Sequence, residues 1–316
     1  MKLHRDVTNL NAIKPVVTIG MFDGVHLGHQ SLLKNVIERA KAIGGESVVL
    51  TFWPHPRILF EGEKSSLRFL TTIEEKVSIM KKIGVNHVIV YPFTHEFANI
   101  EPTDFVKIFL LEGTKAHTVI VGHDHRFGHN GQGDYELLSD LGWIFDFKTE
   151  QVSALDISDT HVSSTKIREA LIAGDIIKAN LFLSYEYSIT GTVVKGNQIG
   201  RTMGFPTANI QPDEKHKQIP GNGVYITEVE IQGKTYKAVA NVGNRPTIVN
   251  NQPEPNIEAF ILDFTEEIYF KPITIRFKGK IRDEMKFGSV EFLKEKIEDD
   301  VTRTRSFFEK SRVPIV

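Results

Sequence analysis

The sequence contains no cysteine among its 316 residues. This absence excludes disulfides, thiolate metal sites, iron–sulfur clusters and thiol nucleophiles. The sequence also has no run of 18 apolar residues, and its first ten residues are mixed with charged side chains rather than forming the apolar core of a signal peptide. We therefore expect a cytoplasmic protein with no membrane association.

The chain also lacks an excess of charge of either sign. Lys and Arg number 38 against 40 for Asp and Glu, a net charge of -2. No global field therefore favours nucleic acid or an anionic membrane, and any phosphate binding must be local. Composition is in the soluble globular range, with 41% hydrophobic and 25% charged residues, and the length predicts roughly two domains.

The first part, residues 1–184, alternates β-branched runs with helical patterns. Strands are expected at residues 15–19, 47–52, 87–91 and 117–121. A capping box of Thr72 and Glu75 predicts a helix through Ile83, and Thr103 is expected to cap a helix through Leu111. Because the apolar runs are nearly continuous, we expect an α/β domain of the Rossmann-like, doubly wound type, with a parallel sheet covered on both faces.

The second part, residues 185–316, is β-rich and leaves no room for crossover helices. Gly, Pro and Asn separate five β-rich stretches, at residues 186–194, 223–231, 235–242, 256–264 and 272–278. We expect an all-β, antiparallel barrel. A final helix, capped by Ser289 and running to Phe308, has a broken apolar stripe, which we expect to pack across the barrel. The alternative is that the stripe forms a surface for binding a partner.

The motif at residues 20–29 follows the first predicted strand and begins a helix. This is the position where open parallel sheets bind anions, because free N–H groups and the helix dipole point at the ligand. Three glycines let the backbone approach a phosphate, and two imidazoles three residues apart can face one oxygen. The alternative is a tight turn with surface histidines. The candidate phosphate ligands here are Gly20, Phe22, Gly24, His26, Gly28 and His29.

Three further segments of the first part carry polar residues. Ser163, Ser164 and Thr165 precede Arg168 at a second helix start, which taken alone is typical of an ordinary cap. His55 lies in a proline-rich turn that could be purely structural. Residues 122–134 have the spacing His-x-His-x-x-x-His, which could indicate zinc, but four glycines suggest a mobile loop rather than a fixed metal geometry.

Residues 20–29 resemble the HxGH element of the nucleotidyltransferase superfamily, in the version found in bacterial FAD synthetases. The resemblance implies that His26 and His29 hold the ATP phosphates and stabilise charge on the α-phosphorus. It also implies that the Ser/Thr stretch ending in Arg168 closes over the β- and γ-phosphates. It places the flavin near His55 and near the loop residues Asp124, Phe127 and Asp134.

The tetrapeptide Pro206-Thr207-Ala208-Asn209 resembles the signature of riboflavin kinases. This resemblance implies that Thr207 and Asn209 hold Mg²⁺, to which their hard oxygen ligands are suited. Glu258, a charge on an apolar β run, is the implied catalytic base, whereas a solvated glutamate is the alternative. A glycine-rich loop before the tetrapeptide is expected to contact the ATP phosphates through Gly196, Gly200, Arg201 and Gly204.

Together the resemblances span residues 14–308 and imply a bifunctional enzyme. Riboflavin would be phosphorylated to FMN, and FMN adenylylated to FAD with release of pyrophosphate. The expected ligands are riboflavin, FMN and ATP, with Mg²⁺ and with FMN and FAD as products, in a monomer or weak homo-oligomer. The alternatives are an adenylyltransferase for another phosphorylated substrate, such as pantetheine phosphate, and a flavin-binding regulator. Residues 181–185 depart from the family, which more often has Gly-Arg-Pro there.

Overall fold

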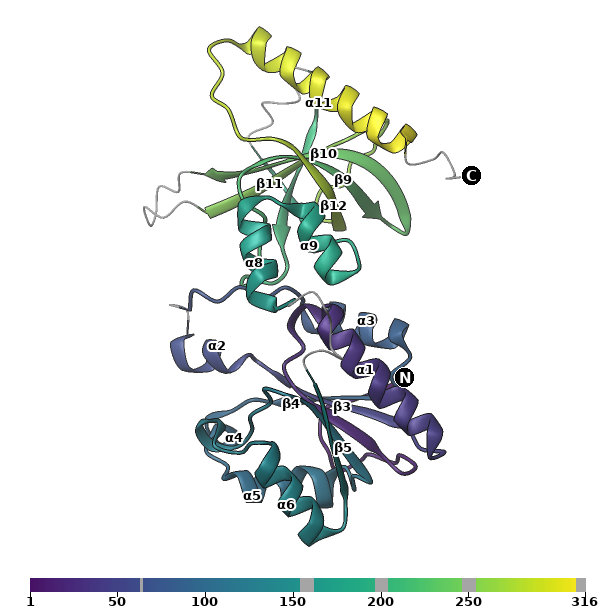
Figure 1. The fold of residues 1–316 in the computed structure, drawn as a ribbon. Helices are drawn as coiled ribbons and strands as arrows, with labels where there is room; N and C mark the ends of the chain where they lie inside the picture. Colours follow the sequence, from purple (N-terminus) through teal and green to yellow (C-terminus); the bar gives the residue numbers. More distant parts are fainter. Residues whose placement is uncertain (63–64, 154–161, 197–203, 246–253, 311–316) are drawn as a thin grey trace. The chain divides into compact units, whose positions relative to one another are not determined.

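The computed structural model describes residues 1–62, 65–153, 162–196, 204–245 and 254–310, without the side chains of residues 244, 245, 254 and 255. The chain forms two compact units, Met1–Ser164 and Thr165–Val316 (Figure 1). Each unit has its own sheet, so each is described by itself.

The first unit is built on a six-stranded parallel sheet with the order β1-β4-β3-β2-β5-β6. Its strands are β1 (Lys2–His4), β2 (Val16–Ile19), β3 (Ser47–Trp53), β4 (His87–Pro92), β5 (Thr118–Gly122) and β6 (Lys148–Val152). Its helical segments are η1 (Asp23–Val25), α1 (Leu27–Ala42), α2 (Pro56–Glu61), α3 (Ile73–Ile83), α4 (His95–Ala98), α5 (Pro102–Phe105), the π-helix η3 (Val106–Gly113), η4 (His129–Gly131) and α6 (Tyr135–Phe145).

Helices cover both faces of this sheet, as predicted (Figure 1). One core cluster joins α1 and α3 to strand residues such as Val16 and Val49. The other joins α5, η3 and α6 to Val17 and Val48, which are the chain neighbours of Val16 and Val49. Successive residues of a strand point to opposite faces, so burial on both sides explains the continuous apolar runs.

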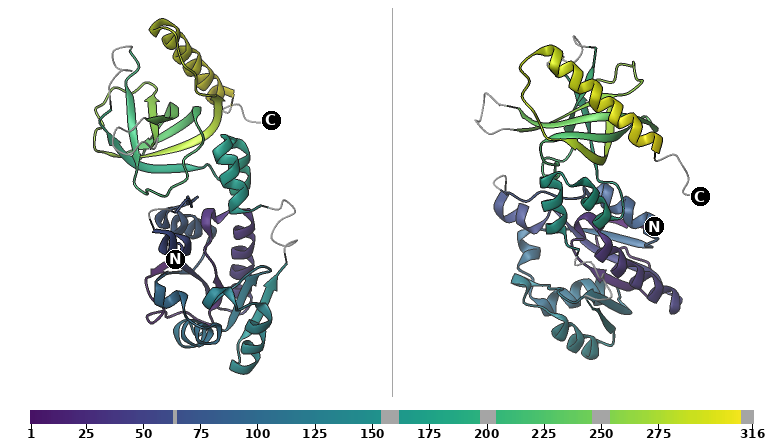
Figure 2. Two further views of the ribbon diagram at one scale, coloured as in Figure 1. Left: turned by 90° about the vertical axis from the view of Figure 1, so that its left-hand side faces the viewer. Right: turned by 45° about the horizontal axis from the view of Figure 1, so that its top comes forward.

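The second unit is a closed antiparallel barrel with the order β10-β11-β8-β7-β12-β9. Its strands are β7 (Ser188–Val194), β8 (Thr207–Pro212), β9 (Gly223–Ile231), β10 (Lys234–Arg245), β11 (Glu254–Ile261) and β12 (Pro272–Arg282). Helix α11 (Val290–Lys310) lies against the barrel and contacts β10 (Figure 2). The Ser289 hydroxyl accepts a hydrogen bond from the Phe292 N–H at 3.2 Å, as expected of a cap.

Helices α8 (Ser164–Ala173) and α9 (Ile176–Leu183) fall in the second unit apart from Ser164. The Asn180 amide of α9 donates to the Phe277 carbonyl of β12 at 2.9 Å, and the Gly221 N–H donates to the Leu171 carbonyl at 2.8 Å. These contacts hold both helices on the barrel. The sequence-based prediction of a first domain at residues 1–184 includes both helices.

Several elements differ from the sequence-based prediction, among them α6, which was not predicted. Strands β1, β6 and β8 were not predicted, since two of them are polar edge strands and the third carries a motif that resembled a loop. The predicted Thr103 cap is wrong, because α5 begins at Pro102 with Glu101 as its N-cap. Proline is favoured at the first helical position, where its missing N–H costs nothing.

Candidate active sites

The turn between β2 and α1 has an unusual backbone. Phe22, Gly24 and Val25 all have positive φ angles, of 48°, 80° and 37°. Phe22 and Val25 are nevertheless buried, at 3% and 0% exposure. The turn is therefore fixed by packing, and it delivers His26 to the N-cap of the sixteen-residue helix α1.

His26 and His29 stack on each other, with ring centroids 3.7 Å apart and planes at 19°. His26 Nδ1 accepts a hydrogen bond from the His29 backbone N–H at 3.4 Å. Burial, with smaller effects of His26 and Lys76, lowers the pKa of His29 well below its usual range, so this imidazole is neutral at pH 7. His29 Nδ1 is buried without a hydrogen-bond partner among the described residues.

Two buried charges anchor this turn to the segment that begins α3. The Asp23 carboxylate accepts from the N–H groups of Leu70 and Thr71 at 3.0 and 3.2 Å. The Lys76 ammonium donates to the Met21 carbonyl at 2.6 Å. Neither residue shows a role in the sequence, because these contacts join residues about 50 positions apart.

Ser164 joins the same turn from the other end of the unit. Its hydroxyl donates to the Asp23 carbonyl at 2.9 Å. Gly20 and Gly28 lie at the end of β2 and in the first turn of α1, beside the histidines. Ser163 directly precedes α8, whereas Thr165 and Arg168 belong to the second unit, so their roles toward a nucleotide remain predictions.

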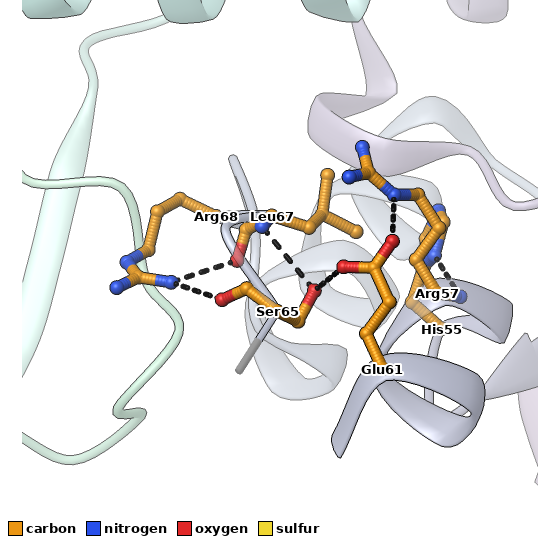
Figure 3. A network of polar contacts seen from close by, with 6 residues as sticks. All are labelled: His55, Arg57, Glu61, Ser65, Leu67 and Arg68. Atoms are coloured by element: carbon orange, nitrogen blue, oxygen red, sulfur yellow. Dashed lines mark hydrogen bonds and ion pairs between the residues drawn. The ribbon is translucent and has the colours of Figure 1, made fainter. Parts of the chain in front are cut away.

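His55 is the N-cap of α2, and its Nδ1 accepts from the Arg57 N–H at 3.2 Å. Figure 3 shows a polar network around it, in which the Glu61 carboxylate lies between Arg57 and Ser65. Arg68 donates to the carbonyls of Ser65 and Leu67, both at 3.1 Å. The network fixes the loop after β3, which gives His55 a structural task in addition to its predicted flavin contact.

The loop after β5 is closed by backbone hydrogen bonds. Phe127 and Gly133 form an antiparallel bridge that closes it, and the His129 N–H donates to the Ile100 carbonyl at 2.7 Å. Phe127 is buried in the core, and Asp134 is the N-cap of α6, where it accepts from the Leu137 N–H at 3.0 Å. Asp124 is exposed, with 84% of its side chain accessible. The mobility expected of this loop stays a prediction, as do the flavin contacts of these residues.

In the barrel, three polar residues form a row across neighbouring strands. Glu258 of β11 is paired with Asn209 of β8 on one side and with Asn241 of β10 on the other. Directly paired residues of antiparallel strands share a face, so all three side chains lie on one face, with Thr207 two positions from Asn209. Ile257 and Ala259 are fully buried on the opposite face, as the alternation predicted.

The environment of Glu258 and Asn209 is crowded. The Asn256 amide donates to Glu258 Oε1 at 2.8 Å. A Cβ added to Gly196 would lie 2.2 Å from the Asn209 amide nitrogen, so a side chain at this position would displace the Asn209 amide. Gly204 has a φ of 89°. Gly200 and Arg201 lie outside the described residues.

Two cavities of the barrel unit meet at Thr207. The larger, about 460 Å³, has a wall of Thr265, Glu266, Glu267 and Tyr269. The smaller, about 310 Å³, has mostly apolar walls, and its polar lining residues include Asn241 and the charged residues Glu258, Arg282, Glu284 and Asp300. Thr207 lines both. The second cavity was not predicted from the sequence, since its walls come from five separate strands and from α11.

Helix α11 forms one wall of the smaller cavity through Leu293 and Ile297. An ion pair between Arg282 of β12 and Asp300 of α11, with Nη2 to Oδ2 at 2.8 Å, ties this wall to the barrel. Asp300 is 3% exposed. A buried carboxylate in the packing face explains why the apolar stripe of α11 looked broken.

Among the described residues, no group of three His, Cys, Asp or Glu side chains is placed to hold a metal ion. The predicted histidine loop thus shows no such cluster. In the same part of the chain, no helix combines the length and apolarity needed to cross a bilayer.

Comparison with known proteins assigns both units. Residues 9–166 match the family model of FAD synthetases, and residues 183–308 match that of riboflavin kinases. A bifunctional riboflavin kinase/FMN adenylyltransferase of Listeria monocytogenes is 37% identical over 98% of each chain. Its counterpart in Bacillus subtilis is 34% identical over 95% of this chain and 94% of that one.

A solved structure has the same fold over nearly the whole chain. It is a protein of Streptococcus pneumoniae described as a macrolide-efflux protein, with a TM-score of 0.85, 30% identity, and coverage of 96% of this chain and 98% of that one. With the curated relatives, it confirms the predicted fold class of an α/β unit followed by a barrel. The chain belongs to the family of bifunctional riboflavin kinase/FMN adenylyltransferases.

Proposed function

We propose that the two activities of the family reside in two separate sites of this chain. Riboflavin is phosphorylated on the face of the barrel that carries Thr207 and Glu258. FMN is then adenylylated at the turn that carries His26 and His29. The observation that carries the kinase assignment is that Thr207 lines both barrel cavities, whereas Glu258 lines only one.

In the kinase site, the smaller cavity fits the flavin, because its mostly apolar walls suit a fused ring system. Glu258 is the polar group that takes the proton from the terminal ribityl hydroxyl, and Asn256 orients its carboxylate. ATP occupies the larger cavity, so the γ-phosphate approaches the hydroxyl past Thr207. The bond between the γ-phosphorus and the oxygen that joins it to ADP breaks, while a bond forms between the γ-phosphorus and the ribityl oxygen.

The donors around Thr207 fit a divalent ion. A threonine hydroxyl and an asparagine carbonyl on one face of β8 are hard oxygen ligands, and Gly196 leaves the Asn209 side chain its room. Thr207 and Asn209 would hold Mg²⁺, which neutralises phosphate charge when bound. The glycine-rich loop, including Gly200 and Arg201, is assigned to the ATP phosphates with it.

In the adenylylation site, an oxygen of the FMN phosphate attacks the α-phosphorus of ATP, and pyrophosphate leaves. Because His29 is neutral, it acts as a hydrogen-bond donor to the phosphate rather than as a countercharge. The first N–H groups of α1 add the helix dipole. Arg168 is assigned to the departing β- and γ-phosphates, and His55, Asp124, Phe127 and Asp134 to the loops that hold the flavin.

Chromatography of the flavins formed from riboflavin, ATP and Mg²⁺ tests this assignment. We expect His29→Ala to abolish FAD formation from FMN while FMN formation continues, and Glu258→Ala to do the reverse. If either variant lost both activities, the two sites would not be separate. Unchanged riboflavin with the wild-type chain would instead favour a flavin-binding regulator. The cytoplasmic location remains part of the proposal.

A further inference from the structure

Lys76 is an unusual residue for its position. It lies on α3, whose other lysines, Lys81 and Lys82, are exposed, yet Lys76 is only 3% exposed. Lysine is almost never fully buried unless its ammonium is paired. Its burial therefore needs an explanation that the stability of α3 does not provide.

The contact that Lys76 makes is not needed to satisfy the backbone. Its Nζ donates to the Met21 carbonyl at 2.6 Å, but the Thr51 hydroxyl donates to the same carbonyl at 3.3 Å. An apolar residue at position 76 would thus leave Met21 with a partner. Fold stability alone would favour that exchange, since it removes a buried charge.

The surroundings of Lys76 match an anionic ligand. An ammonium has three N–H groups, and among the described residues Met21 is its one hydrogen-bond acceptor. The groups that act on it electrostatically from the packed elements are Asp23 of η1 and His29 of α1. Asp23 already accepts from two backbone N–H groups. A cation with spare donors thus lies within electrostatic reach of the unpartnered His29 Nδ1.

We propose that Lys76 is a cationic positioning residue of the adenylylation site. Its ammonium holds the Met21 carbonyl, and with it the turn that presents His26 and His29, and its charge favours the triphosphate at that turn. This inference rests on the proposed function of the histidines. It adds a third residue, from a different helix, to the machinery for adenylyl transfer.

The proposal has a consequence for pH. Burial lowers the pKa of Lys76 to about 8, although Asp23 opposes the shift. The cation is therefore lost from the ATP-free enzyme as the pH rises through about 8. Deprotonation of Lys76 should therefore lower kcat/KM for ATP in FAD formation over that pH range. The described cavity residues of the kinase site in the same chain include no lysine, so riboflavin phosphorylation should not share this decline.

The test compares Lys76→Met, Lys76→Gln and the matched surface variant Lys82→Met in the full chain. For each variant we would measure kcat and KM for FAD formation between pH 6.5 and 9.5, riboflavin phosphorylation, and the unfolding temperature. We expect both Lys76 variants to lose about ten-fold or more of kcat/KM at pH 7, corresponding to 1.4 kcal/mol or more. They should also lack the decline near pH 8, keep kinase activity and unfold no earlier than the wild type. Lys82→Met should match the wild type.

Three results would overturn the inference. One is wild-type FAD formation in Lys76→Met. Another is wild-type activity in Lys76→Gln, which would mean that a neutral donor suffices. The third is a loss of activity that follows a lower unfolding temperature, which would show a structural role. His29→Ala is assayed alongside. If this variant kept FAD formation, the proposed function itself would be wrong. If His29→Ala lost FAD formation while Lys76→Met kept it, only the role of Lys76 would be refuted.

Discussion

The ion pair between Arg282 and Asp300 predicts that kinase activity depends on a contact outside the reacting groups. Arg282 Nε donates to both oxygens of Asp300 at 3.1 and 3.2 Å, and Nη2 donates to Oδ2 at 2.8 Å. The Asp300 side chain is 4% exposed and that of Arg282 is 18% exposed. The pair joins β12 to α11, which carries the cavity residues Leu293 and Ile297.

The size of the effect follows from burial. Removing one partner of a buried pair typically costs 3–5 kcal/mol, because the other charge stays buried. In Asp300→Ala, Arg282 keeps some water and its bond to the Asp283 carbonyl at 3.1 Å. We therefore expect Asp300→Ala to lower the free energy of unfolding of the barrel unit by about 2–3 kcal/mol. The double variant Arg282→Met, Asp300→Leu should lose less than about 1 kcal/mol, since no charge remains buried.

Urea unfolding of Arg282→Met, of Asp300→Leu and of the double variant, followed through the barrel transition, gives the coupling energy of the pair. Riboflavin phosphorylation should fall several-fold in Asp300→Ala, chiefly through KM for riboflavin, while FAD formation from added FMN is unchanged. A coupling energy near zero would refute the reasoning. So would an unchanged KM in a variant that is destabilised as expected.

Three further predictions concern single positions. Gly196→Ala should lower kinase activity ten-fold or more, because its Cβ would lie 2.2 Å from the Asn209 amide, while Gly279→Ala, with open space around it, serves as control. Asp23→Ala should lower the free energy of unfolding of the first unit by about 2 kcal/mol, because it leaves two buried N–H groups without their acceptor, and a urea titration measures this. In a parallel assay the variant should lose FAD formation and keep kinase activity. Lys76→Met should stabilise the first unit at pH 7 by up to about 3 kcal/mol, from a folded pKa of about 8 against 10.5 in the unfolded chain. Wild-type stability rises between those two pH values, because the unfolded chain then binds more protons, so the advantage of the variant should vanish above pH 10.5.

The sequence was sufficient for elements whose pattern is local. The strands at β2 to β5 were predicted because burial on both faces makes each run apolar. The capping box at Thr72 was predicted because both of its hydrogen bonds join residues three apart. Strand β6, with the residues Lys-Thr-Glu-Gln-Val, was missed because an edge strand needs no apolar pattern.

The same limit applies to the sites. The spacing of His26 and His29 at a helix start is a local pattern, and the structure brings the two rings together. Asn241 carries no such signal, since only the register of β10 against β11 places it beside Glu258. Arg282 likewise lines the smaller cavity, and pairs with Asp300 of α11, only because the barrel brings β12 and α11 together.

Lys76 and Asp300 are polar residues at positions where periodicity calls for an apolar one. Each is buried, each lies on a helix that packs over a candidate site, and each bonds to a segment distant in sequence. In a helix of purely structural purpose, leucine or methionine would bury better at either position. A charge retained there despite its cost therefore directs attention to what the helix covers, which is the histidine turn under α3 and the smaller barrel cavity under α11. Lys76→Met should consequently lower FAD formation while it stabilises the first unit, whereas Asp300→Met should lower riboflavin phosphorylation together with the stability of the barrel.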